Sequence, residues 1–179
     1  MRNRSLLTLA LLAGLVLPAH AQRHADLTPA EIDQLRDTAM EPDQRLKLFL
    51  KFARERLDQL QLARTDPKMA AADRPAETHK RLQNFLDVYD ELDENIDTYM
   101  DRKSDIRKAL KAIIEADAEF QAKLKTFREG LTGPKENTKS YEFVLSNAID
   151  AVNSGATDHR KLLDEQEEMA KHKKKKRTD

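Results

Sequence analysis

The clearest pattern in the chain is a heptad repeat of apolar residues between Pro75 and Glu129, a stretch with no internal glycine or proline. Two interleaved sets of positions at seven-residue spacing form this seam, which is typical of helices packed in coiled-coil fashion. The first set is apolar throughout and the second is apolar at all but two positions. The first set comprises Phe85, Leu92, Tyr99, Ile106, Ile113, Phe120 and Phe127, and the second comprises Leu82, Tyr89, Ile96, Lys103, Leu110, Asp117 and Leu124.

Five consecutive polar residues, Asp101–Asp105, leave two interpretations of this stretch open. An unbroken helix over Pro75–Glu129 would span about 80 Å at ~1.5 Å per residue. A break would instead give two helices of about 25 residues each, which suits a compact antiparallel bundle. Because the seam keeps its phase across the polar residues, we favour the unbroken helix.

Shorter amphipathic segments flank this stretch. Thr28–Glu31 has the cap, the proline at the first helical position and the acidic residue that begin a helix. Further helices are expected over Pro42–Ala63 and Ser140–Asn153, with Gly155 ending the latter and one more helix following it. No segment alternates between apolar and polar residues as a strand would. The pattern predicts an all-α fold: an elongated helical bundle with one long coiled-coil-like central helix and shorter helices packed back on it.

The first 21 residues read as a secretory signal peptide. Arg2 and Arg4 precede an apolar run over residues 6–17, and Ala19-His20-Ala21 has the small-x-small pattern of a cleavage site. The run is about twelve residues, too short for a membrane-spanning helix of roughly twenty. We therefore expect a signal peptide over 1–21, a helical domain over 22–170 and a basic C-terminal tail over 171–179. The protein would be exported, periplasmic or secreted, and not lipid-anchored, because the chain has no cysteine.

Charge is distributed unevenly along the chain despite a formal net charge of zero. Residues 22–170 contain 24 basic and 31 acidic residues, a balance of −7. The nine residues that follow contain six basic residues: Lys171, Lys173, Lys174, Lys175, Lys176 and Arg177. Cations at a helix C-terminus are favoured by the helix dipole, yet four consecutive lysines exceed what capping requires. Two interpretations stay open: a solvated tail without a partner, or a contact with an anionic membrane or envelope surface; nucleic acid is a poor match for an exported protein.

Motifs for catalysis and for cofactor binding are absent from the sequence. No serine lies in a Gly-x-Ser-x-Gly turn, no Gly-rich phosphate loop is present, and no His-Glu-x-x-His pair occurs. His172 alone among the histidines follows carboxylates on one helix face, those of Glu165 and Glu168. We interpret that face as an exposed helix end, since a metal site needs three or four ligands. We expect no enzyme, no cofactor, and no catalytic or metal-binding residues.

Leu27–Glu31 resembles the Leu-Thr-x-x-Gln boxes of the Spy- and CpxP-like periplasmic helical stress proteins. The resemblance covers five residues, has Glu31 where that family has glutamine, and is not repeated later in the chain. It implies binding of unfolded or envelope proteins on a helical cradle.

Three functions follow as hypotheses. The leading one is an exported, non-enzymatic scaffold, adaptor or chaperone-like protein that contacts a protein partner or a second copy of itself through the seam. The second is an anionic-surface binder, for lipid headgroups or polysaccharide phosphates, acting through the basic residues of 171–177. The third is a periplasmic metal-binding or stress-sensing helical protein.

Overall fold

The computed structural model describes residues 25–131 and 138–178, with side chains as far as His172. All of the regular structure in these ranges is helical, and no strand occurs in them, so the all-α bundle is confirmed. The elements are α1 (Pro29–Asp37), α2 (Pro42–Thr65), α3 (Arg74–Asp101), α4 (Arg107–Glu129), a short 3₁₀ turn η1 (Thr138–Ser140) and α5 (Glu142–Thr178).

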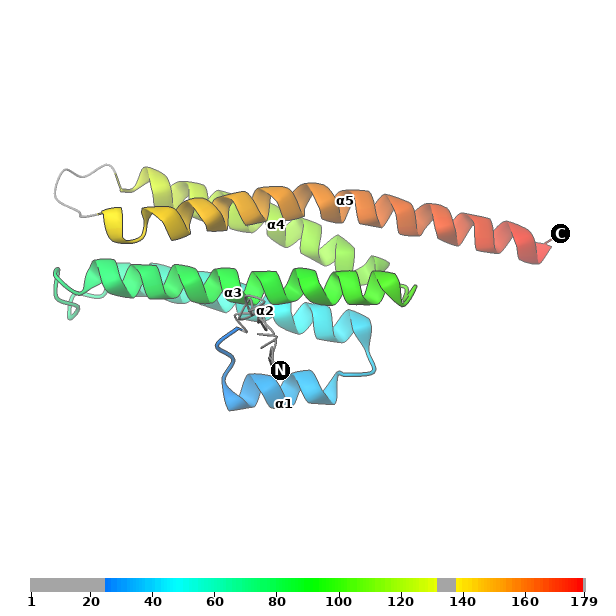
Figure 1. The fold of residues 1–179 in the computed structure, drawn as a ribbon, viewed down its shortest axis with the longest axis horizontal. Helices are drawn as coiled ribbons and strands as arrows, with labels where there is room; N and C mark the ends of the chain where they lie inside the picture. The colour runs from blue at the N-terminus through cyan, green and yellow to red at the C-terminus, as the bar shows by residue number, and fades with distance from the viewer. Residues whose placement is uncertain (1–24, 132–137, 179) are drawn as a thin grey trace, which may run out of the picture.

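Two long hairpins, α2–α3 and α4–α5, make up the bundle (Figure 1). The hairpins pack on each other through α3 against α5 and α2 against α4, so α3 and α4 lie diagonally opposite although they are consecutive in the chain. The side chains of α3 and α4 meet in the centre, where the rings of Phe85 and Phe120 are 5.5 Å apart in an edge-on contact. The helix α1 packs on the outside of α2 (Figure 1).

The predicted start of the first helix is confirmed in detail. Thr28 and Glu31 form a capping box, in which each side chain accepts a hydrogen bond from the other residue's backbone amide. The carboxylate of Glu31 also accepts two hydrogen bonds from the buried guanidinium of Arg56 on α2, at 2.9 and 2.8 Å. These bonds lower the pKa of Glu31 even though burial raises it. One acidic residue therefore caps α1 and fixes it to α2.

The favoured unbroken helix over Pro75–Glu129 is wrong, because α3 ends at Asp101 and α4 begins at Arg107. Lys103 adopts a left-handed backbone with φ of 55°, which reverses the chain direction. The five polar residues offer no apolar side chain to bury, so ending the helix there loses little packing. Both helices turn their apolar faces to one core, and the heptad phase is the same in both. Phase therefore could not distinguish one unbroken helix from two helices joined by a turn.

The prediction that Gly155 ends a helix is also wrong, since α5 runs through it for 37 residues and is the longest helix described. A Cβ atom at Gly155 would lie 2.3 Å from the hydroxyl oxygen of Tyr89. The glycine thus provides room for a close approach of α5 to α3, at a cost of up to about 1 kcal/mol in helix propensity. In the sequence, a glycine that ends a helix cannot be told from one that allows two helices to pack closely.

The heptad seam lies inside the chain's own core. Phe85, Phe120 and four other members of its first set are at most 5% exposed, whereas Phe127 is only partly buried. The helices α2 and α5 supply the facing apolar residues, including Phe49 and Phe52, and Tyr141 joins them from the turn directly before α5. The apolar residues of the seam are therefore packed against helices of the same chain.

Candidate functional site

A polar cluster in the middle of the bundle joins three helices. The imidazole of His159 on α5 lies between two carboxylates: its Nδ1 is 2.8 Å from Oδ2 of Asp117 on α4, and its Nε2 is 3.0 Å from Oδ1 of Asp93 on α3. The hydroxyl of Tyr89 donates to Oδ1 of Asp117 at 2.8 Å. His159, Asp117 and Tyr89 are buried, and the side chain of Asp93 is 40% exposed. We call these four residues the His159 cluster.

With both carboxylates ionised, the geometry of the His159 cluster calls for a charged imidazole. Each ring nitrogen faces a carboxylate oxygen, so both contacts are hydrogen bonds only if both nitrogens carry protons. Burial lowers the pKa of His159, but the hydrogen bonds to Asp117 and Asp93 outweigh it and raise the pKa to about 9. Burial raises the pKa of Asp93, and burial together with the charge of Asp117 raises that of Tyr89, which stays a neutral donor.

This arrangement has a clear chemical consequence. An imidazolium has no lone pair, so His159 can neither ligate a metal nor accept a proton at neutral pH. Across residues 25–131 and 138–178, no group of three metal-ligating side chains is placed to hold an ion. The hydrogen bonds of the His159 cluster attach α5 to α3 and α4.

Gln166 makes a second attachment of α5, at the turn between α3 and α4. Its amide nitrogen donates to the carbonyl of Ser104 at 2.7 Å, and its carbonyl oxygen accepts from the amide of Ile106 at 3.0 Å. Ile106 is the N-cap of α4, whose first amides have no partner within the helix. The buried side chain of Gln166 thus attaches the turn to α5. The next residue of α5, Glu167, forms a surface ion pair with Lys111 at 3.0 Å.

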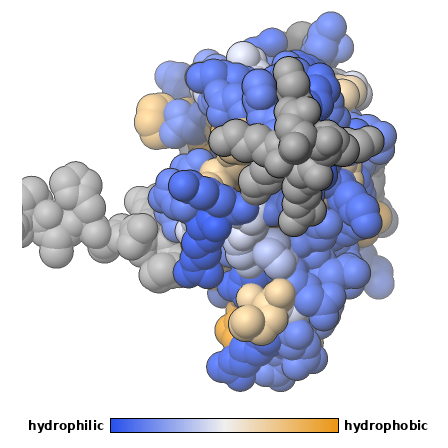
Figure 2. All heavy atoms as spheres, turned by 90° about the vertical axis from the view of Figure 1, so that its right-hand side faces the viewer, coloured by the Kyte–Doolittle hydropathy of each residue, from blue (hydrophilic) through white to orange (hydrophobic). Residues whose placement is uncertain are grey.

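The C-terminal part of α5 leaves the bundle and projects past the turn between α3 and α4 (Figure 1). The 37 residues of α5 correspond to about 55 Å, against about 35 Å for the 23 residues of α4. Figure 2 views the molecule from this end, where hydrophilic residues cover most of the visible surface. The projecting part of the helix contains the basic residues of 171–177.

The predicted anionic-surface residues are only partly described. The Nζ of Lys171 forms an ion pair with the carboxylate of Glu168 at 2.6 Å, and His172 is exposed. The side chains of Lys173, Lys174, Lys175, Lys176 and Arg177 lie outside the described part, although the helical backbone includes these residues. Glu168 thus binds a neighbouring lysine, as expected for an exposed helix end.

The predicted partner seam is not brought to the surface. Its residues face α2 and α5 in the core, so a protein partner or a second copy would have to use another face of the bundle. The two polar seam positions also have roles within the chain: Lys103 forms the turn, and Asp117 belongs to the His159 cluster.

Sequence reasoning missed most of the His159 cluster. Asp117 could be singled out as a polar residue on an apolar seam, but its partner lies 42 positions away. Asp93 belongs to an acidic stretch of α3 and has no feature of its own in the sequence. The chain reversal at Lys103 is what brings these residues together, so the partner of Asp117 could not be found while the helix was taken as continuous.

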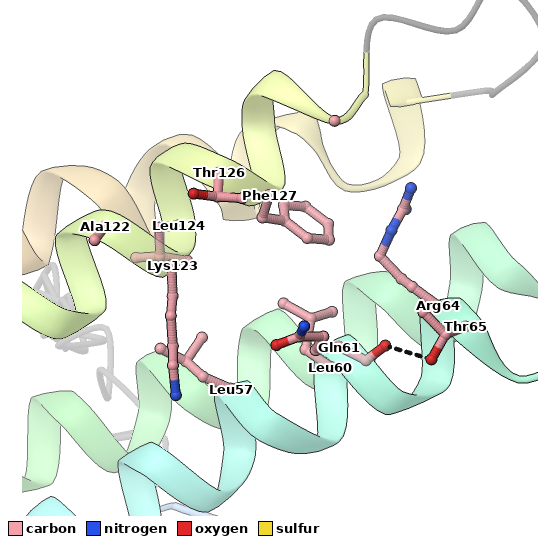
Figure 3. A pocket seen from close by; sticks show the side chains of 11 residues that line it. Leu57, Leu60, Gln61, Arg64, Thr65, Ala122, Lys123, Leu124, Thr126 and Phe127 are labelled. Atoms are coloured by element: carbon pink, nitrogen blue, oxygen red, sulfur yellow. Dashed lines mark hydrogen bonds between the residues drawn. The ribbon is translucent and has the colours of Figure 1, made fainter.

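A groove lies between the C-terminal turns of α2 and α4 (Figure 3). It has a volume of about 510 Å³. Its apolar lining includes Leu57, Leu60, Leu124 and Phe127, and its charged lining residues are Arg64 and Lys123. The groove lies at the opposite end of the bundle from the projecting part of α5 (Figure 1).

Comparison with known proteins gives no relative: no family model, curated protein or solved structure matches the chain. Within the part of the chain that the structure describes, no helix is both long enough and apolar enough to cross a membrane.

Proposed function

We propose that the protein is an exported, non-enzymatic helical protein that attaches to a phosphate-bearing anionic surface through the basic end of α5. The observation that carries the proposal is the projection of this helix beyond the bundle, with six basic residues among its last turns. A helix fixed to the bundle at His159 and Gln166 holds these residues away from the acidic remainder of the chain.

The distribution of charge favours one orientation at such a surface. The six cations attract it, each contributing about 1 kcal/mol within a Debye length of roughly 10 Å. Residues 22–170, with their balance of −7, are repelled by the same surface. The bundle would therefore stand off from the surface and present its other end. Export is part of this proposal because the first 21 residues have the pattern of a signal peptide.

Co-sedimentation with vesicles tests this proposal. The chain from Gln22 and a version that ends at Ala170 are compared on vesicles of phosphatidylglycerol mixed with phosphatidylcholine. We expect the shorter chain to bind at least about a hundredfold more weakly, because six contributions of about 1 kcal/mol are lost. Thermal unfolding followed by circular dichroism controls for the fold of the shorter chain.

A second arm separates the two sources of phosphate. Beads carrying a poly(glycerol phosphate) polymer present the same charge without a lipid interface. Retention on vesicles alone supports a lipid surface, and retention on both supports a general phosphate surface. Equal binding by the two chains, or binding by neither, would overturn the proposal.

A further inference from the structure

Basic residues gather at the end of the bundle past which α5 projects. Residues 101–111 include the turn between α3 and α4 and the start of α4, and they contain five basic and two acidic residues, a balance of +3. Residues 22–170 as a whole have a balance of −7. The charge of this turn is therefore opposite in sign to that of the bundle. The five basic residues are Arg102, Lys103, Arg107, Lys108 and Lys111.

Three of these five cations are not held in ion pairs. Arg107 pairs with Asp105 at 2.6 Å, and Lys111 pairs with Glu167 at 3.0 Å. The side chains of the other three are exposed and form no ion pair or hydrogen bond with any residue that the structure describes. We call these three residues the turn cations: Arg102, Lys103 and Lys108.

The turn cations lie close to the basic end of α5. The side chain of Gln166 bonds to Ser104 and Ile106, so Gln166 marks the level of the turn along α5. At ~1.5 Å per residue, residues 171–177 extend from about 8 to about 17 Å beyond that level. Neighbouring helices pack about 8–10 Å apart, and α5 contacts both α3 and α4. A flat surface therefore touches the basic end of α5 and the turn together when the bundle tilts toward the turn.

The acidic residues of α3 set a limit to this tilt. Between Asp87 and Asp97, α3 contains six acidic residues and no basic one. At ~1.5 Å per residue they lie about 6 to 21 Å behind the end of the helix at Asp101. A bundle lying flat would bring them within a Debye length of roughly 8 Å of an anionic surface, which would repel them. Repulsion at this side and attraction at the turn favour one tilted orientation.

We propose that the turn cations form a second contact with the phosphate-bearing surface, so that the bundle stands tilted on the turn and on the basic end of α5. This inference rests on the proposed attachment through α5 and adds a contact that fixes the orientation of the bundle. Each cation at an anionic surface strengthens binding about fivefold. Two contacts on one rigid body also bind more tightly than either contact alone, because the second contact forms within the same molecule.

The opposite end of the bundle provides a matched comparison. It also has three exposed basic residues whose side chains form no ion pair with any described residue. The 23 residues of α4 separate the two ends by about 35 Å, which is several Debye lengths. Cations at that end do not share a surface with the basic end of α5, so they control for net charge. They are Lys68, Lys80 and Lys139.

Co-sedimentation with phosphatidylglycerol-containing vesicles at about 0.15 M salt compares three chains that begin at Gln22. We expect the turn variant to bind at least about tenfold more weakly than the unaltered chain, and the opposite-end variant to stay within about twofold. Thermal unfolding followed by circular dichroism checks the fold of each. The turn variant has Arg102→Gln, Lys103→Gln and Lys108→Gln, and the opposite-end variant has Lys68→Gln, Lys80→Gln and Lys139→Gln.

Beads carrying a poly(glycerol phosphate) polymer separate the two sources of phosphate. Weaker binding of the turn variant on vesicles and beads alike assigns the contact to phosphate groups in general. Weaker binding on vesicles alone assigns it to lipid headgroups.

A fluorescent label tests the orientation without removing any charge. The chain has no cysteine, so one introduced cysteine is labelled specifically. Thr98→Cys places the label on the last turns of α3, and Ala72→Cys places it at the opposite end; both positions are exposed. On vesicles with nitroxide-bearing headgroups, we expect strong quenching at residue 98 and little quenching at residue 72.

The turn contact is overturned if the turn variant binds like the unaltered chain, if the opposite-end variant is weakened as much, or if residues 98 and 72 are quenched equally. The chain that ends at Ala170 separates this failure from that of the proposed function. If that chain loses binding while the turn variant keeps it, attachment through α5 stands and the turn contact fails. Absence of binding by the unaltered chain would overturn both.

Discussion

Two regions of the bundle differ in how completely they bury the apolar faces of their helices. In the first, which we call the clamped half, α5 is held to α3 and α4 by the His159 cluster and by Gln166. In the second, the open end, α2 and α4 end with a groove between them. Ile113 and Phe127 belong to one heptad set on one helix, yet Ile113 is fully buried and Phe127 is not. Apolar periodicity alone thus does not ensure that the helices pack without a groove between them. The buried polar contacts lie in the region where the packing is complete.

The largest expected effect comes from breaking the His159 cluster. Asp117→Asn removes a fully buried carboxylate and leaves Asp93 as the one anionic partner of His159 among the described residues. Loss of one member of a buried ion pair costs about 3–5 kcal/mol, so we expect about 4 kcal/mol less stability in urea unfolding at pH 7. Asp97→Asn, at an exposed position of α3, should change stability by less than about 0.5 kcal/mol. A cost below about 1 kcal/mol for Asp117→Asn would mean that the cluster does not clamp α5.

The next prediction compares Ile113 and Phe127, one from each region of α4. Ile113→Ala opens a cavity in a fully packed region and should cost about 3 kcal/mol. Phe127→Ala deletes a larger side chain, but one that already borders the groove and is partly exposed, so it should cost no more than about 2 kcal/mol. Urea unfolding of both variants measures the difference. If Phe127→Ala proves the more costly, the groove is not an open end of the core.

Alkaline pH should weaken the clamped half alone. The pKa of His159 is about 9 in the folded chain and 6.5 without its partners, so the folded state holds the proton more tightly. The stabilisation is complete below pH 6.5 and is lost as the pH rises through 9. At 1.36 kcal/mol per unit it amounts to about 3 kcal/mol.

Unfolding free energies between pH 6 and pH 10 measure this loss. The decline should be absent in His159→Gln and retained in His79→Gln, whose ring is exposed and contacts the carbonyl of Ser140. A decline of equal size in both variants would assign it to other groups.

The smallest predicted effect concerns the turn that closes the clamped half. Lys103 has φ of 55°, which glycine adopts without strain, so Lys103→Gly should raise stability by up to about 1 kcal/mol. In a continuous helix the same substitution would lower stability by about 0.5–1 kcal/mol. The sign of the change in thermal unfolding therefore distinguishes the hairpin from the unbroken helix.

The sequence predicted the helices better than it predicted their connections. Heptad spacing identified the buried faces of α3 and α4, and Thr28–Glu31 identified the start of α1. Two errors arose where a residue has two possible structural roles: Lys103 could continue a helix or reverse it, and Gly155 could end a helix or admit Tyr89. The His159 cluster depends on that reversal, and the groove depends on the angle between hairpins, which periodicity does not specify.

The salt dependence of vesicle binding tests the central claim most directly. The chain from Gln22 is titrated with phosphatidylglycerol-containing vesicles at about 0.05 M and 0.15 M salt, beside a variant in which the six basic residues of 171–177 are glutamine. If the basic end of α5 is the attachment site, the unaltered chain binds, weakens steeply with salt as screening shortens the range of attraction, and the variant does not bind. Binding that is equal in the two chains, or indifferent to salt, would contradict attachment through this end of the molecule.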